Sequence, residues 1–532
     1  MDDYTTVMLG NRHTIVLVAI AASLTGLACL LLWNDEGQQQ LMRNTAALAA
    51  LACAISLPVG TLLAFLLVRT DVPGRRAALV LMAAMLLLPL YLQASAWHAG
   101  FILAGGSVTS PLLTGLPAAA WIHAMASIPW VVLIVGVGIR YVEPELEEDA
   151  LLAGSTLQVF LRVTAPRMIA AMGVAALWVL LSTASEMTVT DLYRVRTYAE
   201  VIYTGFALGD DLCSAWLTAA PGIAAGASLV VFTFVVASTA APSLQAASRP
   251  PWTFRLGIWR WPALLFALAV VIGTVAIPVG NLVYKAGETM RPVDGVIVSQ
   301  WSATKFAEVL APILRDHGEE FGWTVLISSL AATAALTLSA PLAWLARRGG
   351  RRSMPALATA AVCLVTPGPL VGLGVIWLLD RNLPLAIWLY DRTVLAPVLA
   401  MLVRILPIAI LLCWYALRSV SDDVLDSAAT EGAGPCRRFW LIAAPQRLSA
   451  IGAAWLAAFV VATGDLACSI LVVPPGVTTV PIKVFGLIHY GVDDQVAGIC
   501  LTSLVGFVIT AGTALWLFRR SPLQQNTQHS LY

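Results

Sequence analysis

Two short polar stretches between long apolar segments decide the fold: Glu148–Pro166 reads EDALLAGSTLQVFLRVTAP and Asp426–Pro445 reads DSAATEGAGPCRRFWLIAAP. In each stretch the initial carboxylate is followed by an alanine two positions later, a glycine six positions later and a closing proline. These shared positions are Ala150 and Ala428, Gly154 and Gly432, and Pro166 and Pro445. An acidic residue favours the first turn of a helix, glycine permits a left-handed or close-packed bend, and proline ends a helix. The pattern predicts two helix-turn-helix loops on a membrane surface.

The composition is that of an integral membrane protein. Of the 532 residues, 59% are hydrophobic and 11% are charged, and the mean hydropathy is +0.83, which is too apolar for a soluble chain of this size. A net charge of +1 leaves no basic surface for nucleic acid. The eight cysteines fall mostly in apolar segments and lack the spacing of a metal site, so we expect neither cysteine ligands nor disulfides.

Apolar segments of about 20 residues can cross the roughly 30 Å hydrocarbon core of a bilayer as helices. We therefore expect an all-α membrane protein with about twelve spans, the first of them a retained anchor and the third irregular around Pro89. Six spans precede the linker, at residues 14–33, 44–68, 77–104, 117–141, 168–185 and 215–240. Six follow it, at residues 261–284, 321–346, 354–379, 393–417, 448–473 and 496–518.

The distribution of basic residues predicts the orientation, because Lys and Arg concentrate at the cytoplasmic ends of spans. Twenty arginines lie on the side that carries both polar stretches, so these stretches and both termini are expected in the cytoplasm. The longest external segment is then Lys285–Glu320. All three lysines, Lys285, Lys305 and Lys483, fall outside, but they remain a minority of the basic residues.

The chain is also an internal duplication. Five landmarks recur at a constant numbering offset of 278, and the closing prolines recur at an offset of 279. The five pairs are Pro89 and Pro367, Pro129 and Pro407, Arg140 and Arg418, Ala150 and Ala428, and Gly154 and Gly432. We expect a first repeat at residues 1–240, a cytoplasmic linker at 241–260 and a second repeat at 261–532, in the same membrane orientation because each holds an even number of spans.

The two polar stretches resemble the EAA loop of permease subunits of ATP-binding-cassette importers, and the whole chain is similar to the fused permeases of binding-protein-dependent importers. Glu148-Asp149-Ala150 and Asp426-Ser427-Ala428 stand where that family usually has Glu-Ala-Ala, and the first loop is one residue shorter between glycine and proline. The resemblance implies the type I importer permease fold, a bacterial inner-membrane location, two ATPase copies on the cytoplasmic side and an external substrate-binding protein.

The resemblance also implies which residues contact the ATPase. They are Glu148, Ala150, Gly154, Phe160, Pro166, Asp426, Ala428, Gly432, Trp440 and Pro445. The chain itself has no GxxxxGK[ST] phosphate loop, no HExxH and no Ser/His/Asp set outside the spans. We therefore expect a transport subunit that is not an enzyme and binds no cofactor, with ATP used by the partner.

Charged residues near the spans are candidates for the transport pathway. Glu186 and Asp465 lie at the predicted outer ends of matching spans, at a numbering offset of 279, and could line a route for a cation. The alternative is that each carboxylate only begins a polar outer loop. Arg404 lies within a span and needs a partner, for which Asp465 is the candidate. We expect His98 and His123 to be core histidines and not ligands, and no metal ligand is assigned.

The substrate follows from the resemblance alone. Single-chain double permeases of this length are typical of the ferric-iron type, which makes ferric iron the first expectation. Thiamine, aminoethylphosphonate and polyamines are the alternatives. A different class, the secondary transporters of the major-facilitator type, also has twelve spans, and Asp71, Gly74, Arg75 and Arg76 resemble its charged turn after the second span. That class lacks a duplicated loop of the EAA kind.

Overall fold

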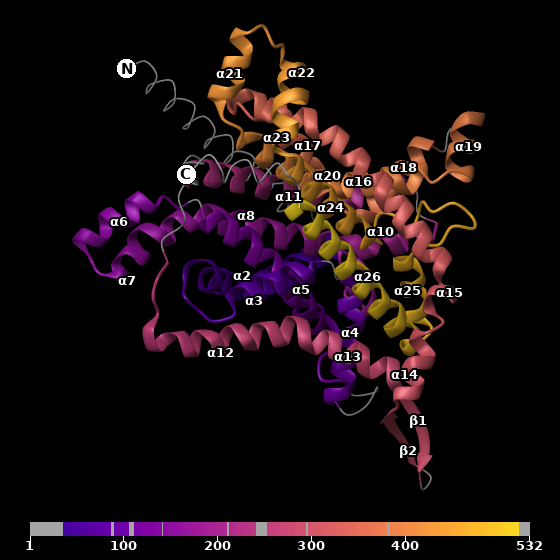
Figure 1. Cartoon of the computed structure of the whole chain (residues 1–532). Helices are drawn as coiled ribbons and strands as arrows, with labels where there is room; N and C mark the ends of the chain where they lie inside the picture. Colours follow the sequence, from indigo (N-terminus) through magenta and orange to yellow (C-terminus); the bar gives the residue numbers. More distant parts are fainter. Residues whose placement is uncertain are drawn as a thin grey trace. The chain divides into compact units, whose positions relative to one another are not determined.

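A computed structural model describes residues 36–86, 90–105, 111–140, 142–209, 212–240, 253–293, 296–379 and 383–520. The predicted span at 14–33, Pro89, the C-terminal tail and most of the linker therefore lie outside the described residues. Within the described ranges, seven helices are long and apolar enough to cross a membrane, or up to ten when each bent pair counts as one span. The protein is a helical membrane protein (Figure 1).

One compact unit is built on three helices, α2 (Glu36–Arg69), α5 (Gly115–Ile139) and α8 (Ala165–Ala184), which pack against one another. Small residues let these helices approach closely. A Cβ added to Gly60 would lie 2.7 Å from the Val131 side chain, and one added to Gly138 would lie 2.2 Å from the Ala171 Cβ. Close contact between small residues is the main source of helix association in lipid. The helix α11 (Leu212–Ala240) packs on α8.

A second compact unit repeats this pattern with α16 (Gly318–Ala346), α20 (Leu395–Arg418) and α24 (Leu448–Thr463). Its core is again rich in alanine. The fully buried alanines of this core are Ala331, Ala332, Ala335, Ala409, Ala458 and Ala462. These three helices stand at the positions of α2, α5 and α8 when the chain is shifted by the numbering offset of the duplication.

The boundaries of the compact units differ from those of the predicted repeats. Among the described residues, the first unit lies within 36–86, 96–281 and 365–370, and the second lies within 90–95, 282–364 and 371–520. The helix α12 (Arg260–Val271), which opens the predicted second repeat, therefore packs in the first unit, against α2 and α3 (Arg75–Met85). Sequence repeats and packing units need not coincide, because a span can pack against either copy.

Three apolar helix pairs are sharply bent at a short break. The helices α3 and α4 (Leu90–Gly105) meet at 104°, and α17 (Met354–Val365) and α18 (Gly368–Leu379) meet at 106°. Pro367 lies in the break between α17 and α18, where it supplies no backbone N–H and disfavours helix in the preceding residue. The short helices from Pro435 to Gln446 meet α24 at 82°.

Two departures from the expected helices are clear. The predicted span at 448–473 is wrong in length, because α24 ends at Thr463 and is followed by turns that contain Pro474, Pro475 and Gly476. An apolar run can form buried turns as well as helix, and proline and glycine favour the turns. A short apolar helix, α25 (Val480–His489), then precedes α26 (Asp493–Arg520).

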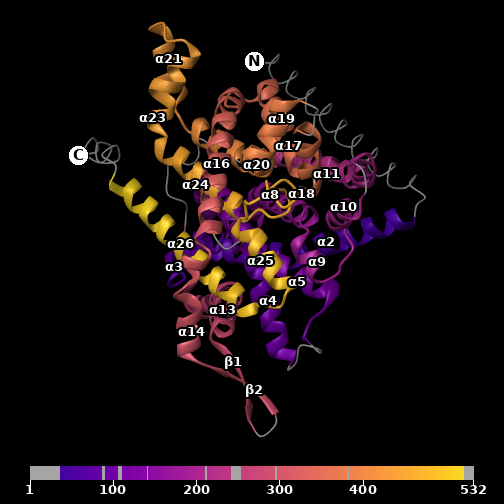
Figure 2. The same cartoon turned by 90° about the vertical axis from the view of Figure 1, so that its right-hand side faces the viewer.

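The predicted external segment contains a β-hairpin, an exception to the helical fold. Strands β1 (Glu288–Val293) and β2 (Val296–Trp301) pair antiparallel and project from α14 (Ala303–Leu310), as Figure 2 shows. Salt bridges hold this segment in the second unit. Lys285 Nζ lies 3.6 Å from Asp493 Oδ2 and Lys305 Nζ lies 2.8 Å from Asp494 Oδ2, both at the start of α26.

Candidate functional sites: two loops and two buried carboxylates

The first motif loop, Glu148–Pro166, joins the short helix α6 (Pro144–Ala153) to α8. Pro144 lies in the first turn of α6, where its missing N–H costs nothing, and acidic residues follow in that turn. Gly154 ends α6 with an extended backbone (φ −155°), and α7 (Thr156–Val159) begins two residues later. In Figure 1, α6 and α7 project beyond the end of α8 within this unit.

The second motif loop, Asp426–Pro445, has the same order with a longer turn. The helix α21 (Asp422–Thr430) is followed by Gly432 in the left-handed region (φ +87°), and α22 (Pro435–Arg438) follows the turn. Of the two bends that glycine permits, Gly432 therefore has the left-handed one, whereas Gly154 is extended and closely packed against Gln158. The first loop is one residue shorter, and its turn is correspondingly tighter.

Both loops contain a turn of π-helix at matching positions. These turns are η1 (Phe160–Thr164) and η6 (Phe439–Ala443), related by a numbering offset of 279. A π-turn inserts one extra residue into a helix and is often found at functional sites. It changes which side chains face outward at that point of the loop.

The two aromatic residues expected at the ATPase contact, Phe160 and Trp440, do not occupy matching positions in the two loops. Phe160 packs inward against Phe65, with ring centroids 4.7 Å apart, so it is not exposed for a partner. Its counterpart at an offset of 279 is Phe439, which packs against Trp344 at 5.5 Å. Trp440 is 68% exposed and corresponds instead to Leu161, which is 57% exposed. The sequence analysis did not name Leu161 as a contact residue because it selected the adjacent aromatic residue, Phe160.

The remaining predicted contact residues are mostly accessible. Glu148 and Asp426 are exposed, as are Pro166 and Pro445, whereas Ala150 and Ala428 are half-buried. The expectation that each proline ends the second short helix is wrong. Pro166 lies in the first turn of α8, and Pro445 lies in α23 (Ala444–Gln446), since proline is tolerated at the start of a helix.

A buried ion pair connects the first loop to the helices behind it. Arg69, the last residue of α2, pairs through Nη2 with Glu147 Oε2 of α6, and both side chains are 0% exposed. Arg69 Nη1 also donates to the Ile139 carbonyl at the end of α5 (3.1 Å), and Thr164 Oγ1 donates to Glu147 Oε1 (2.6 Å). The ring of Phe254, in the linker, lies 5.8 Å from Arg69 Cζ.

The second loop has a related contact with a different acid. Arg347, just after α16, donates through Nε to the Leu417 carbonyl (3.1 Å) and through Nη2 to the Val420 carbonyl (2.8 Å). Its Nη2 lies 2.7 Å from Asp422 Oδ1; the arginine side chain is 6% exposed and the aspartate 78%. Sequence reasoning treated Arg69 and Arg347 only as topology markers. Their offset of 278 was the signal that could have singled them out.

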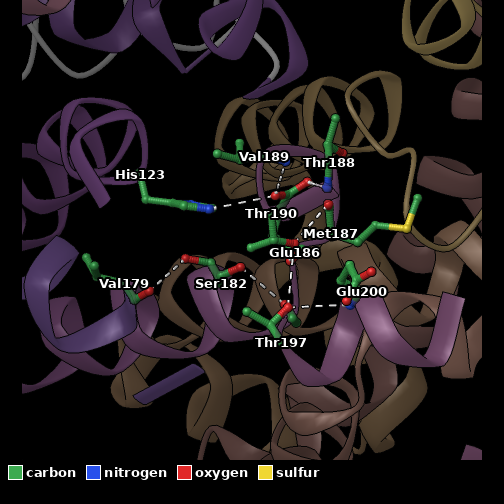
Figure 3. Close-up of polar contacts among 11 residues, drawn as sticks. His123, Val179, Ser182, Glu186, Met187, Thr188, Val189, Thr190, Thr197 and Glu200 are labelled. Atoms are coloured by element: carbon green, nitrogen blue, oxygen red, sulfur yellow. Dashed lines mark hydrogen bonds and ion pairs between the residues drawn. The ribbon is translucent and has the colours of Figure 1, made fainter. Parts of the chain in front are cut away.

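Glu186 is largely buried, with 11% of its side chain exposed, and backbone N–H groups engage its carboxylate, as Figure 3 shows. Its oxygens accept hydrogen bonds from the N–H groups of Thr188 (2.6 Å) and Val189 (3.0 Å), at the start of α9 (Thr188–Leu192). The His123 ring points at the same carboxylate, with Nε2 3.7 Å from Oε2, and is 4% exposed. Glu186 thus accepts from two of the N–H groups that a helix leaves unpaired at its start. His98 lies elsewhere, with Nδ1 3.2 Å from the Tyr193 hydroxyl.

Asp465 has the matching environment in the second unit. It follows α24 directly, is buried, and its Oδ2 accepts a hydrogen bond from the Cys468 N–H (3.2 Å). The charge of Arg404, on α20, acts on this carboxylate. Within the described residues, no group of three or more His, Cys, Asp or Glu side chains could hold a metal ion.

Comparison with known proteins finds similarity to a transport permease. It is 29% identical over 233 residues to the putrescine transport system permease protein PotI of Escherichia coli K12 and, equally, to that of Escherichia coli O6:H1. The match covers 41% of this chain and 76% of PotI. No protein-family model matches the chain.

Proposed function

We propose that this chain is the permease of an ATP-driven importer that carries a small organic cation of the polyamine class into the cytoplasm. The observation that carries the proposal is the duplicated loop, in which two short helices and a π-turn precede a span at matching positions of the two repeats. The similarity to PotI supports the same transport class.

Both halves of the transport channel are proposed to lie in this one chain. The matched 233 residues cover 76% of PotI but only 41% of this chain, which is therefore long enough for two such units. The recurrence of the three-helix core, α2, α5 and α8 as α16, α20 and α24, supports a fused duplication. We propose the inner membrane as its location, with both termini cytoplasmic.

Each motif loop would dock on one copy of an ATPase subunit. The exposed apolar side chains on the loops suit a protein cleft, and they are Leu152, Leu161, Trp440 and Leu441. Glu148 and Asp426, both exposed, add a charge at each site. A substrate-binding protein would dock at the other face, on the segment Lys285–Glu320 that carries the hairpin.

The substrate proposal rests on the relative. PotI is named for putrescine, which favours the polyamine alternative over ferric iron, and thiamine or aminoethylphosphonate have no such support. Glu186 and Asp465 remain candidates for the pathway, but they do not carry the substrate proposal, because backbone N–H groups already engage both carboxylates.

The rival class of secondary transporters rests on the turn after α2. Asp71 and Arg75 of that turn both have hydrogen-bond partners in the protein. Asp71 Oδ1 accepts from the Leu256 N–H (2.9 Å), and Arg75 Nη1 donates to the Thr70 carbonyl (2.6 Å). These contacts account for the two charged residues without a transport role. A secondary transporter also has no ATPase subunit for the duplicated loops to bind.

The test is purification of the tagged chain after expression with the ATPase and binding protein encoded beside it. We expect two ATPase copies per chain and ATP-dependent uptake of radiolabelled putrescine by reconstituted vesicles that contain the binding protein. Uptake driven by a proton gradient in the absence of an ATPase would support the rival. ATP-dependent uptake of ferric iron but not putrescine would keep the importer and overturn the polyamine class.

A further inference from the structure

Two arginines occupy the same place in the duplicated architecture. Arg69 and Arg347 are related by the offset of 278, and they donate to the carbonyls of Ile139 and Leu417, which are related by the same offset. Each arginine thus fastens the end of one long helix to the end of another, α2 to α5 and α16 to α20. Each also pairs with a carboxylate on the first short helix of its motif loop.

The two carboxylates differ in position and in burial. Leu425 stands where the first loop has Glu147, and Asp422 stands where it has Pro144. Leu425 is buried with Ala443, the counterpart of Thr164 at an offset of 279, in an apolar cluster. The first loop therefore has a buried charged contact where the second has an apolar one, and the second loop places its charged contact at the surface.

The first arginine has further ties that hold it in place. Its carbonyl accepts a hydrogen bond from the Phe254 N–H (2.7 Å), and the Phe254 ring packs against Phe65 as well as lying over the guanidinium. Phe160 of the π-turn packs against the same Phe65. The end of α2, the linker and the first motif loop thus form one packed cluster.

We propose that Arg69 with Glu147, and Arg347 with Asp422, are the joints that transmit movement of each motif loop to the long helices, and that the first joint is stiffer than the second. Separating a buried ion pair leaves charges without solvent, so it resists opening, whereas an exposed pair exchanges its partner for water at little cost. These are positioning residues. The transmission role rests on the proposed function, but the difference in stiffness does not.

The stiffness difference is tested on the full chain in detergent, without ATPase or substrate, by backbone amide hydrogen exchange. We expect the amides of α6 to exchange more slowly than those of α21. Glu147→Gln should accelerate exchange in α6 and leave α21 unchanged. Asp149→Asn removes a charge of the same sign from an exposed site on the same helix and should change neither. Equal exchange in α6 and α21 of the unmodified chain would overturn the difference.

The transmission role is tested in the reconstituted complex by the number of substrate molecules imported per ATP hydrolysed. We expect Glu147→Leu to lower this ratio by roughly fivefold or more, the usual range of coupling between distant sites, with the ATPase still bound. Adding Pro144→Asp supplies a carboxylate at the position that the second loop uses, and should restore most of the ratio. An unchanged ratio in Glu147→Leu, or restored stability without a restored ratio in the double variant, would overturn the role.

Failure of the stiffness difference or of the transmission role can be distinguished from failure of the proposed function. If the unmodified complex neither binds an ATPase nor imports putrescine, the proposed function is wrong and the exchange experiment still decides the stiffness difference. If Glu147→Leu does not fold, Glu147→Gln keeps an oxygen to accept from Thr164 and serves in its place.

Discussion

Gly432 and Gly154 offer a matched test of how the two motif loops turn. Gly432 has φ +87°, and its turn is closed by hydrogen bonds from its own N–H to the Ala429 carbonyl (3.0 Å) and from the Ala433 N–H to the Ala428 carbonyl (2.9 Å). A Cβ added there would meet nothing within 4 Å, so the cost of Gly432→Ala is that of the backbone conformation alone. For an L-residue in the left-handed region that cost is about 1 to 2 kcal/mol.

The same substitution at Gly154 has a different cost. Its backbone is extended, a conformation open to any residue, and an added Cβ would lie 2.8 Å from the Gln158 Oε1 at the end of an exposed, flexible side chain. That side chain can move at the loss of its hydrogen bond from the Ser155 N–H (3.0 Å). Loss of an exposed contact of this kind costs about 0.5 kcal/mol or less.

Amide hydrogen exchange at residues 432–433 of the full chain measures the opening of the second turn. We expect Gly432→Ala to speed exchange about 5- to 30-fold, which corresponds to about 1 to 2 kcal/mol, and Gly432→Asn to speed it less because Asn tolerates the left-handed region. Gly154→Ala should change exchange in the first turn only slightly. Similar effects of the two alanine substitutions, or no advantage of Asn over Ala at position 432, would refute the reasoning.

Three further predictions concern topology, the buried carboxylates and acid stability. A cysteine at Ser155 or Ala433 should resist membrane-impermeant thiol reagents in intact cells, and labelling from outside would reverse the proposed orientation. Glu186→Gln should lower the free energy of unfolding by about 1 kcal/mol, the value of a helix cap, and Asp465→Asn by about 1 to 3 kcal/mol because the charge of Arg404 loses a compensating group; normal uptake in the double variant would remove these residues from the pathway. Burial acts to raise the pKa of Glu288, but hydrogen bonds from Lys285 and Ser299 and the Lys285 charge outweigh it and hold the pKa below its ordinary value, and burial of Asp494 is likewise outweighed by Lys305. Because both folded pKa values are depressed, this stabilisation is present above the ordinary carboxyl pKa of about 4 and is lost as the pH falls through the folded pKa values. Amide hydrogen exchange in β1 and β2, corrected for its intrinsic rate, should therefore accelerate at acid pH. Exchange in α20 should not.

The long helices could be predicted from the sequence because lipid imposes one rule on them. Every backbone group in hydrocarbon must be paired, so an apolar run of sufficient length is a helix. This logic located α2, α5, α16 and α20 to within a few residues at most ends, apart from the start of α2. It failed after Thr463, because buried turns inside a protein can be as apolar as a span, and hydropathy does not separate lipid-facing from protein-facing residues.

The candidate sites were predicted less completely than the helices. The spacing of acid, alanine and glycine located both loops, but it could not show the π-turns. In the first π-turn Phe160 packs against Phe65 and Leu161 is exposed. The spacing also drew attention to the exposed Glu148 when the neighbouring Glu147 is the buried one. Which of two adjacent carboxylates faces inward depends on the angle at which the short helix leaves the membrane, and that angle is set by packing.

A single geometric rule explains how the charged contacts differ between the two copies. The acid that pairs with the matched arginine lies at Glu147 in the first copy and at Asp422 in the second, one helical turn earlier. The base whose charge or ring acts on the carboxylate after the third core helix is His123 in the first copy, 3.7 Å from Glu186, and Arg404 in the second, three residues beyond the position that matches His123. Residues three apart lie on the same face of a helix. An arginine side chain is long enough to reach its carboxylate partner after a shift of three residues. The arginine contacts to the carbonyls of Ile139 and Leu417 are the same in both copies, because any residue supplies a carbonyl. Backbone contacts therefore preserve the architecture of the duplication, while side-chain partners are free to change by one turn and to give each copy its own burial and its own stiffness.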